Sequence, residues 1–266
     1  MPSVIITGAD RGLGLSLCRE YLSRGWIVFA GKFMDDYFFL ENLREENPNL
    51  NILRIDMGAG ESIKAAARKV SEILGEKSAL DMIISNAALM ENATDSEAPW
   101  RAFNVNALGP LRLTKAFLPL MSPCGGHKPC GAPCGGHLPC GGHQPCGAPC
   151  GGQKAGMRRL SFVSSEVACI TLMKNRQPDT YAYPMSKAAM NMGVRLMFNE
   201  LFPLGYTFRL FHPGWMKFRE KDGRLTENGR FDPDTIGKIA AKYFETPLPD
   251  EHRLVMTDYN GCEWPF

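Results

Sequence analysis

The run Thr7-Gly8-Ala9-Asp10-Arg11-Gly12-Leu13-Gly14 decides the fold of this chain. It follows a short apolar segment, Val4–Thr7, and opens a stretch, Leu13–Arg24, whose apolar residues recur with helical period. Glycines at such a junction permit a tight turn and let a pyrophosphate approach the backbone amides of a helix N-terminus. A strand, a glycine turn and a helix in this order predict a dinucleotide-binding site.

Short apolar runs alternate with helical segments along the rest of the chain. The predicted strands are Val4–Thr7, Ile27–Gly31, Ile52–Ile55, Met82–Ser85, Leu160–Ser164, Phe208–Phe211 and Leu254–Thr257. The predicted helices are Leu13–Arg24, Tyr37–Glu46, Ser62–Leu74, Trp100–Leu120, Pro184–Leu201 and Thr235–Phe244. This alternation over residues 1–266 predicts a single α/β domain, a parallel sheet with helices on both faces.

The composition excludes several classes of protein. Hydrophobic residues make up 44% of the chain and charged residues 22%, so the chain is not mostly disordered. The net charge is +2 and the basic residues are dispersed, so no nucleic-acid partner is expected. No apolar run reaches about 18 residues, and no secretory signal precedes the first strand. We therefore expect a cytoplasmic protein without a membrane partner.

A low-complexity segment, residues 123–152, interrupts this pattern. Cys, Gly, Pro and His fill 25 of its 30 positions, and the sequence of Pro123–Leu138 recurs from Pro139 with few changes. Pro and Gly at this density disfavour helix and regular strand, so we interpret the segment as an inserted loop. It joins a predicted helix to the fifth predicted strand, which places it at the amino ends of the strands. Ligands bind at the opposite, carboxyl ends.

The same insert has two possible roles. Cys130 and Cys134, like Cys146 and Cys150, have a spacing used by zinc-binding turns, and three histidines lie among them. Tandem repeats of this composition also occur as flexible segments without a function. The first interpretation predicts a metal-binding module, whereas the second predicts a neutral insert. We assign no metal ligand.

Tyr183 and Lys187 stand four residues apart in a predicted helix. They share one face of that helix, so the lysine ammonium can lower the pKa of the phenol and let it exchange a proton with a substrate. Most such pairs are only a partly exposed helix face. Tyr181 is a weaker candidate because Met185, not a lysine, follows it at this spacing.

Six motifs follow one another along the chain: Thr7–Gly14, Ser85-Asn86-Ala87-Ala88, Asn104-Val105-Asn106-Ala107-Leu108-Gly109, Ser164-Ser165, Tyr183-Pro184-Met185-Ser186-Lys187 and His212-Pro213-Gly214-Trp215. In this order they resemble the short-chain dehydrogenase/reductase family, over nearly the whole chain outside the insert. The ending Asp258–Pro265 resembles that of carbonyl-reductase-like members. The resemblance implies a Rossmann-type doubly wound sheet and NAD(P)-linked carbonyl or alcohol chemistry.

The resemblance also implies roles for individual residues. Tyr183 would be the general acid in reduction and the general base in oxidation. Lys187 would lower the pKa of Tyr183 and hold the nicotinamide ribose. Ser165 would hydrogen-bond the substrate oxygen, where negative charge develops. Asn106 would hold a water that links Lys187 to solvent. The plainer alternatives are a helix-interior amide for Asn106 and a turn-capping hydroxyl for Ser165.

The resemblance also implies a set of cofactor-binding residues. They are Gly8, Asp10, Arg11, Gly12, Leu13, Gly14, Lys32, Asp56, Met57, Asn86, Ala87, Ala88, Tyr183, Lys187, Pro213, Gly214 and Met216. Relatives that prefer NAD carry an acid where Lys32 stands, and a lysine there would attract a 2′-phosphate. Arg11 would face the same phosphate, so NADP(H) is predicted over NAD(H). As plain alternatives, Lys32 and Arg11 are solvated cations, and Asp56 is a turn former rather than a contact to adenine.

The chain departs from the family pattern in three places. Ala88 replaces a glycine, and Phe218 replaces a threonine that would reach the cofactor carboxamide. Ser165 and Tyr183 lie 18 positions apart, a wide separation for the family, so a loop over residues 172–180 is expected beside the substrate. None of these changes removes a catalytic side chain.

The sequence therefore predicts an NADP(H)-dependent reductase of small carbonyl or alcohol substrates. Family members commonly form dimers or tetramers, so a homodimer or homotetramer is possible. The first alternative is a cofactor-binding regulator or signalling protein on the same fold, which Ala88 and Phe218 make plausible. The second is a metal-binding module carried on an inert scaffold.

Overall fold

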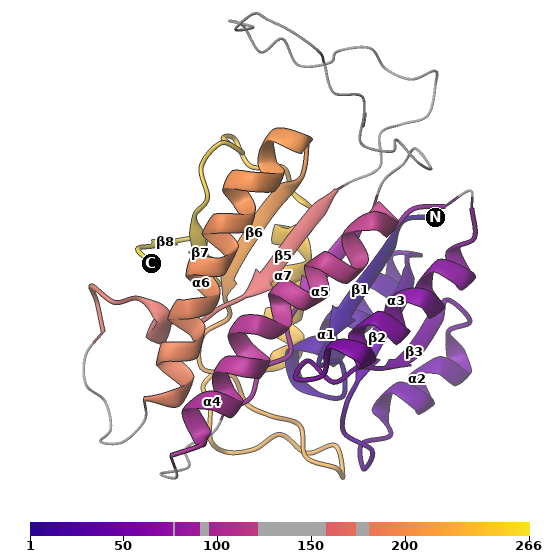
Figure 1. The fold of residues 1–266 in the computed structure, drawn as a ribbon. Helices are drawn as coiled ribbons and strands as arrows, with labels where there is room; N and C mark the ends of the chain where they lie inside the picture. Colours follow the sequence, from indigo (N-terminus) through magenta and orange to yellow (C-terminus); the bar gives the residue numbers. More distant parts are fainter. Residues whose placement is uncertain (77, 91–95, 122–157, 174–180) are drawn as a thin grey trace, which may run out of the picture.

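A single mixed sheet forms the centre of the molecule (Figure 1). The computed structural model describes residues 1–76, 78–90, 96–121, 158–173 and 181–266. The strands are β1 (Ser3–Thr7), β2 (Ile27–Lys32), β3 (Leu50–Arg54), β4 (Met82–Ser85), β5 (Arg159–Val163), β6 (Thr207–His212), β7 (Met256–Asp258) and β8 (Glu263–Trp264). Their order across the sheet is β3-β2-β1-β4-β5-β6-β7-β8. The pairs from β3 to β7 are parallel, and β8 runs antiparallel to β7.

The strand order reverses beside β1, since the chain first builds outward to β3 and then returns to place β4 on the other side of β1. In a doubly wound sheet, ligands bind in the crevice outside the carboxyl ends of the strands at such a reversal. The glycine turn after β1 and the Asn86 turn after β4 both lie at this point. The fold therefore predicts a ligand site at the carboxyl ends of β1 and β4.

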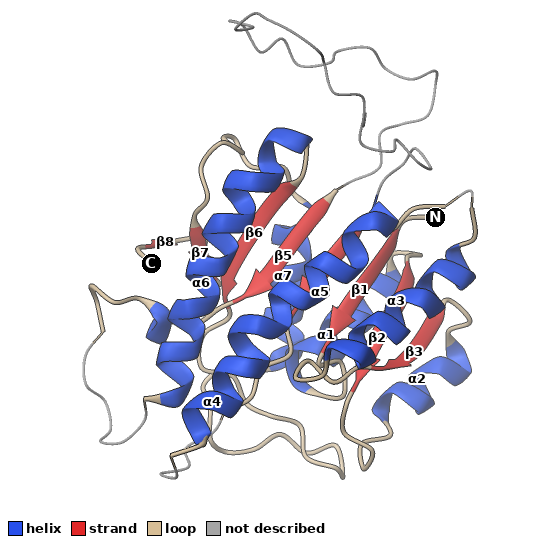
Figure 2. Ribbon diagram, in the orientation of Figure 1, coloured by secondary structure: helices blue, strands red, loops and turns tan. Residues whose placement is uncertain are grey.

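Helices cover both faces of the sheet (Figure 2). The α-helices are α1 (Gly12–Ser23), α2 (Phe39–Glu46), α3 (Gly60–Leu74), α4 (Ala98–Phe103), α5 (Gly109–Phe117), α6 (Ala182–Leu201) and α7 (Pro233–Glu245). Short helices are η1 (Asn104–Leu108), η2 (Leu118–Met121), η3 (Glu166–Ala168) and η4 (Phe202–Leu204). Buried residues of α1, α2 and α7 pack on one face, and those of α3, α5 and α6 on the other. None of the helices in the described part of the chain is long and apolar enough to cross a membrane.

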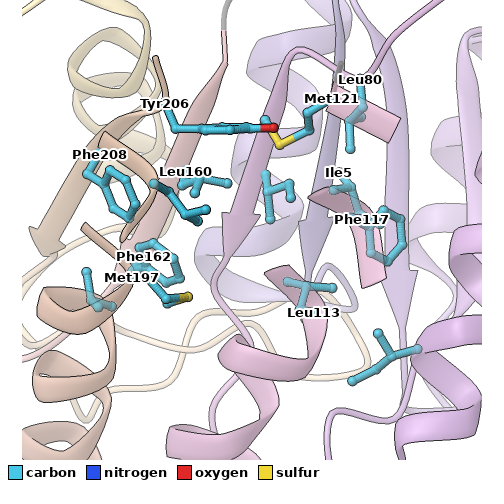
Figure 3. Packing of buried hydrophobic residues seen from close by; sticks show 14 of the residues in the cluster. Ile5, Leu80, Leu113, Phe117, Met121, Leu160, Phe162, Met197, Tyr206 and Phe208 are labelled. Carbon is cyan, nitrogen blue, oxygen red and sulfur yellow. The ribbon is translucent and has the colours of Figure 1, made fainter. Parts of the chain in front are cut away.

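Alternate strand residues supply the two apolar cores. Ile5 and Ile83 point toward α3, α5 and α6, whereas Val4 and Ile6 point toward α1 and α7. Figure 3 shows the first core, in which Phe162, Phe208 and residues of the neighbouring helices fill the space above the sheet. Strands buried on both faces explain why these segments read as continuous apolar runs in the sequence.

The predicted class, a Rossmann-type doubly wound sheet, is confirmed, and every predicted strand exists. Several predicted bounds differ from the observed ones by one or two residues, and the predicted layout is wrong in two further respects. β3 begins two residues before the predicted Ile52 and ends one residue before Ile55. The antiparallel β8 was not predicted, so the sheet is not wholly parallel. The predicted helix Trp100–Leu120 divides into α4, η1, α5 and η2, and η1 is a π turn. Pro110, just after η1, has no N–H to donate to an earlier carbonyl, which favours such an irregularity.

The predicted insert at 123–152, with its Cys and His residues, lies outside the described residues. Its flanks are described: η2 ends at Met121 and β5 begins at Arg159. Leu80 N–H donates to the carbonyl of Leu120 at 2.8 Å, so the end of η2 lies beside the amino end of β4. Both flanks therefore stand at the sheet edge opposite to the glycine turn.

We expect that replacing residues 123–152 with a short Gly/Ser linker leaves folding and cofactor affinity nearly unchanged. Loop length changes closure entropy only slowly, and both flanks are remote from the candidate site. Thermal unfolding and a cofactor titration measure the two properties. Loss of turnover in a folded, cofactor-binding deletion variant would contradict the expectation. If the segment carries a structural metal instead, a chelator should lower the Tm of the intact chain but not of the deletion variant.

Candidate active site

The glycine turn after β1 is built for close approach. Gly8 has a positive φ of 64°, and a Cβ atom there would lie 2.7 Å from the Cα of Ala87. A Cβ on Gly14 would overlap the carbonyl oxygen of Gly8. Gly12, with φ of 56°, has a single neighbour within range, a ring carbon of Phe218 at 4.0 Å. Gly8 and Gly14 therefore allow the backbone of the turn to pack closely, and Gly12 leaves the space beside the turn open.

The first turn of α1 fits a phosphate group. Arg11 occupies the N-cap position in an extended conformation and makes no side-chain capping bond, and no acidic residue stands in the first turn. The amides of Gly12, Leu13 and Gly14 begin the helix, where N–H groups and the helix dipole favour an anion. The residues present thus suit the pyrophosphate of a dinucleotide.

Two predicted cofactor residues brace this turn from within. Asp10 Oδ1 accepts hydrogen bonds from Phe33 N at 2.8 Å and Met34 N at 2.7 Å, which ties the turn to the loop after β2. Asn86 Nδ2 donates to the carbonyls of Thr7 and Gly8 at 2.9 and 3.1 Å. Both side chains are therefore committed to holding the backbone of the turn.

The predicted residues after β3 and β4 lie at the same edge. Asp56 Oδ1 accepts from Gly58 N at 2.8 Å, as a turn former does. Met57 is buried in the core beside Gly109, so its side chain packs in the core. Ala87 N donates to Thr7 Oγ1 at 3.1 Å, and Ala88, in the place of a family glycine, is exposed.

The two predicted cations are not simple solvated side chains. Lys32 is buried, and its Nζ lies 2.7 Å from Glu41 Oε1 and 5.3 Å from the centre of the Phe38 ring. Arg11 is half-buried and donates to Tyr37 Oη at 2.6 Å. Because Glu41 offsets the charge of Lys32, the positive potential at this end of the site comes mainly from Arg11.

Tyr183, in the first turn of α6, is half-buried, and its hydroxyl is hydrogen-bonded to Ser165. Burial raises the pKa of Tyr183 to about 12, and the bond to Ser165 opposes this only in part. That Lys187 lowers this pKa stays a prediction.

Lys187 lies beneath Tyr183 with 2% of its surface exposed. Its Nζ donates to the carbonyl of Val163 at 2.8 Å and lies 5.8 Å from the centre of the Tyr183 ring. Burial lowers the pKa of Lys187 to about 8. The bond to Val163, at the end of β5, fixes the lysine between the helix and the sheet.

Asn106, in the π turn η1, is fully buried and joins three segments. Its Oδ1 accepts from Leu89 N at 2.7 Å, and its Nδ2 donates to the Leu89 carbonyl and to Ser186 Oγ, both at 2.9 Å. Ser186 Oγ in turn donates to the carbonyl of Tyr183 at 2.8 Å. These bonds link the loop after β4 to the turn of α6 that carries Tyr183, and none of them goes to Lys187.

The loop after β6 completes this edge of the sheet. Pro213 is buried, and Gly214, with φ of 77°, packs so closely that a Cβ would lie 2.7 Å from the Phe231 ring. Met216 forms a β-bridge with Phe231. Phe218, in the place of a family threonine, lies beside the glycine turn, with the centre of its ring 5.4 Å from the guanidinium carbon of Arg11.

One residue in a predicted motif gains a role that the sequence did not assign. His212 Nδ1 lies within hydrogen-bond distance of Glu166 N at 3.2 Å and of Gly214 N at 3.4 Å. It thus joins the turn that follows Ser165 to the loop that follows β6. A histidine before Pro-Gly was visible in the sequence, but its partner Glu166 was not.

Other sequence predictions have mixed outcomes. Tyr181 is 63% exposed and projects away from the core. Of the expected loop over 172–180, Leu172 and Met173 are exposed, and the remaining positions lie outside the described residues. Trp264, in β8, donates to Asp258 Oδ2 at 3.1 Å and packs on the His212 ring, so the chain ending seals the sheet edge. Among the described residues, no group of three or more His, Cys, Asp or Glu side chains could hold a metal ion.

Comparison with known proteins identifies the family. A family model described as short chain dehydrogenase matches residues 2–128. C-signal of Myxococcus xanthus is 30% identical over 197 residues, which cover 70% of this chain and 93% of that protein. An uncharacterized oxidoreductase of Schizosaccharomyces pombe is 29% identical over 219 residues, covering 80% of this chain and 72% of the relative. The chain belongs to the short-chain dehydrogenase family of oxidoreductases.

The fold has a counterpart among solved structures. The NADPH-bound carbonyl reductase from chicken fatty liver superposes with a TM-score of 0.76 at 24% identity, covering 100% of this chain and 99% of that one. At this identity the likeness establishes the architecture of the sheet and its helices. The sheet order and the helix layers described above are those of this fold.

Proposed function

We propose that this protein is an NADP(H)-dependent reductase of small carbonyl compounds with Tyr183 as its general acid. The observation that carries the proposal is that Tyr183 lies beside Ser165 and over the buried Lys187, whose Nζ is 5.8 Å from the centre of the Tyr183 ring. These three side chains come from α6 and the end of β5, at the same sheet edge as the open glycine turn. The proposed proton donor, Tyr183, and the proposed dinucleotide-binding turn after β1 therefore lie at the same edge of the sheet.

The chemistry needs a hydride and a proton. NADPH, when bound, supplies the hydride to the carbonyl carbon. Tyr183 donates the proton to the carbonyl oxygen, so the C=O group becomes an alcohol. With a pKa raised to about 12, Tyr183 is protonated at neutral pH, which suits a proton donor.

The surrounding residues prepare the donor. Ser165, bonded to Tyr183, would also donate to the substrate oxygen as negative charge develops there. Lys187 would stabilise the phenolate left after proton transfer and hold the nicotinamide ribose. Asn106 would act mainly by position, because its amide holds Leu89 and Ser186 and so orients the turn that carries Tyr183. The water relay proposed for Asn106 needs a further partner beyond these.

The cofactor assignment has two supports. The uncapped, acid-free first turn of α1 suits a pyrophosphate, and Arg11 stands beside it. A neighbour of the same fold is a carbonyl reductase with NADPH bound. By analogy, Gly12, Leu13 and Gly14 would hold the pyrophosphate, and Arg11 with Lys32 would face the 2′-phosphate.

We therefore expect the protein to bind NADPH more tightly than NADH. Lys32→Asp should flatten or reverse the preference, because it adds a carboxylate next to Glu41, and two acids would repel a 2′-phosphate. Fluorescence titrations with both cofactors measure the ratio of the two dissociation constants. Lys64→Asp is the matched control, since Lys64 also pairs with a glutamate, Glu61, but on the exposed face of α3. Tighter binding of NADH by the unmodified protein would refute the assignment.

A second function has one specific observation in its favour. The relative that this chain covers to 93% is named C-signal, which is consistent with a signalling role on the same fold. The alanine at position 88 and the phenylalanine at 218 depart from the cofactor-binding pattern of the family. A turnover screen with NADPH and a panel of carbonyl compounds separates the two functions, since a regulator binds cofactor without consuming it.

A further inference from the structure

Arg11 is held by two aromatic rings from distant parts of the chain. Its guanidinium carbon lies 5.0 Å from the centre of the Tyr37 ring and 5.4 Å from the centre of the Phe218 ring. Its Nη1 also donates to Tyr37 Oη at 2.6 Å. Tyr37 itself is fixed, with 6% of its surface exposed. Three segments thus meet at Arg11: the glycine turn, the loop after β2 and the loop after β6.

The charge of Arg11 is left without an anion. Within the described residues, no carboxylate lies within ion-pair distance of its guanidinium. Arg11 contributes to the lowered pKa of Asp36, but only slightly. The main cause of that lower pKa is a hydrogen bond from Lys221 to the Asp36 carboxylate. Lys221 therefore occupies that carboxylate. Lys32, the other cation proposed to face the phosphate, is paired with Glu41, whereas Arg11 has no such pair among the described residues.

We propose that Tyr37 and Phe218 form a clamp that holds Arg11 ready for the 2′-phosphate of NADP(H), and that this clamp determines the choice between the two nicotinamide cofactors. The inference rests on the proposed function, which it deepens. An arginine fork held in one orientation loses less side-chain entropy when it meets a phosphate, and the aromatic rings keep it partly desolvated. With Nη1 directed at Tyr37, the Nε and Nη2 donors are free to turn toward an anion.

The proposed clamp gives a physical reason for the phenylalanine at position 218, where the family has a threonine. A threonine at this position would serve the nicotinamide end of the cofactor, whereas the centre of the Phe218 ring lies 5.4 Å from the guanidinium carbon of Arg11, at the phosphate end. Its backbone is fixed by Thr226, whose Oγ1 accepts from Phe218 N at 2.9 Å and whose N–H donates to the Phe218 carbonyl at 2.8 Å. The loop after β6 is thereby coupled to recognition of the adenosine phosphate.

The test uses fragments of the cofactor, so that turnover is not needed. The probes are 2′,5′-ADP, which carries the phosphate in question, and 5′-ADP, which lacks it. Isothermal titration of the intact chain should show tighter binding of 2′,5′-ADP. Tyr37→Phe, which keeps the ring but removes the hydroxyl, should weaken 2′,5′-ADP binding about 5- to 10-fold. Phe218→Leu should weaken it about threefold. Neither variant should change 5′-ADP binding.

Matched controls separate the clamp from general damage. Tyr243→Phe removes the hydroxyl of a half-buried tyrosine on α7, which donates to Thr257 Oγ1 at 3.1 Å. Phe202→Leu removes a ring stacked on Phe198, at the other end of α6. Both should leave the ratio of the two affinities unchanged. If the Tyr37 variant fails to fold, the more exposed Phe218 position still tests the clamp.

The outcomes are distinguishable. An unmodified protein that binds neither NADPH nor 2′,5′-ADP overturns the proposed function and this inference with it. An unmodified protein that prefers 2′,5′-ADP, with the same preference in both clamp variants, overturns the inference alone. Selective loss of 2′,5′-ADP binding in the variants supports both.

Discussion

Replacing Tyr183 with phenylalanine should reduce turnover about a hundredfold or more while NADPH still binds. The variant keeps the ring between Lys187 and the substrate side but removes the hydroxyl bonded to Ser165, which is the proposed proton donor. Loss of a positioned general acid typically costs about 10²- to 10⁴-fold. Steady-state rates of NADPH oxidation, together with a cofactor titration, separate loss of chemistry from loss of binding.

The matched control is Tyr181→Phe. Tyr181 stands two residues earlier, at the N-cap of α6, and is 63% exposed. Its loss of a hydroxyl should leave the rate close to that of the unmodified protein. Full activity in the Tyr183 variant would contradict the role of Tyr183 as general acid and would make Tyr181 the next candidate.

Lys187→Met should have a comparable effect on turnover, a fall of about a hundredfold. The substitution keeps an apolar chain of similar length but removes the ammonium that would stabilise a Tyr183 phenolate. Because Lys187 is also proposed to hold the nicotinamide ribose, the affinity for NADPH should fall as well. A rate within a few fold of normal would contradict the assigned role of the lysine.

The same variant should change how stability depends on pH. Burial lowers the pKa of Lys187 from its ordinary value of 10.5 to about 8, so between pH 8 and 10.5 the unfolded chain binds more protons than the folded one. This group therefore adds stability as the pH rises through that window, and its penalty is complete below pH 8. Comparing Tm from pH 8 to 10, Lys187→Met should show a less positive slope than the unmodified protein. Identical slopes would show that Lys187 titrates normally in the folded state.

The fold could be predicted because its determinants are local. The glycine turn reads directly as strand, turn and helix, and β4 occupies exactly the predicted residues, Met82–Ser85, because it is a short apolar run buried on both faces. The two-residue β8 gives no such pattern, since it exists only through pairing with β7. The π turn at Asn104–Leu108 is likewise invisible to a periodicity of 3.6 residues.

The candidate site was predicted as a set of residues but not as a set of interactions. Motif order identified Ser165, Tyr183 and Lys187, which lie together in the structure. The spacing of Tyr183 and Lys187 indicates a nearby cation but not the burial that raises the pKa of Tyr183. The partners of Lys32 and Arg11, Glu41 and Tyr37, come from packing of the loop after β2 and carry no motif.

The most direct test of the account is the rate of NADPH oxidation by the purified intact chain with a panel of aldehydes and ketones, measured beside Tyr183→Phe. The account predicts that NADPH is consumed in equal amount to the alcohol formed, and that the variant loses this activity while it retains NADPH affinity. Binding of NADPH without turnover of any carbonyl compound, by a folded and unmodified chain, would contradict a reductase and favour a regulator on the same fold.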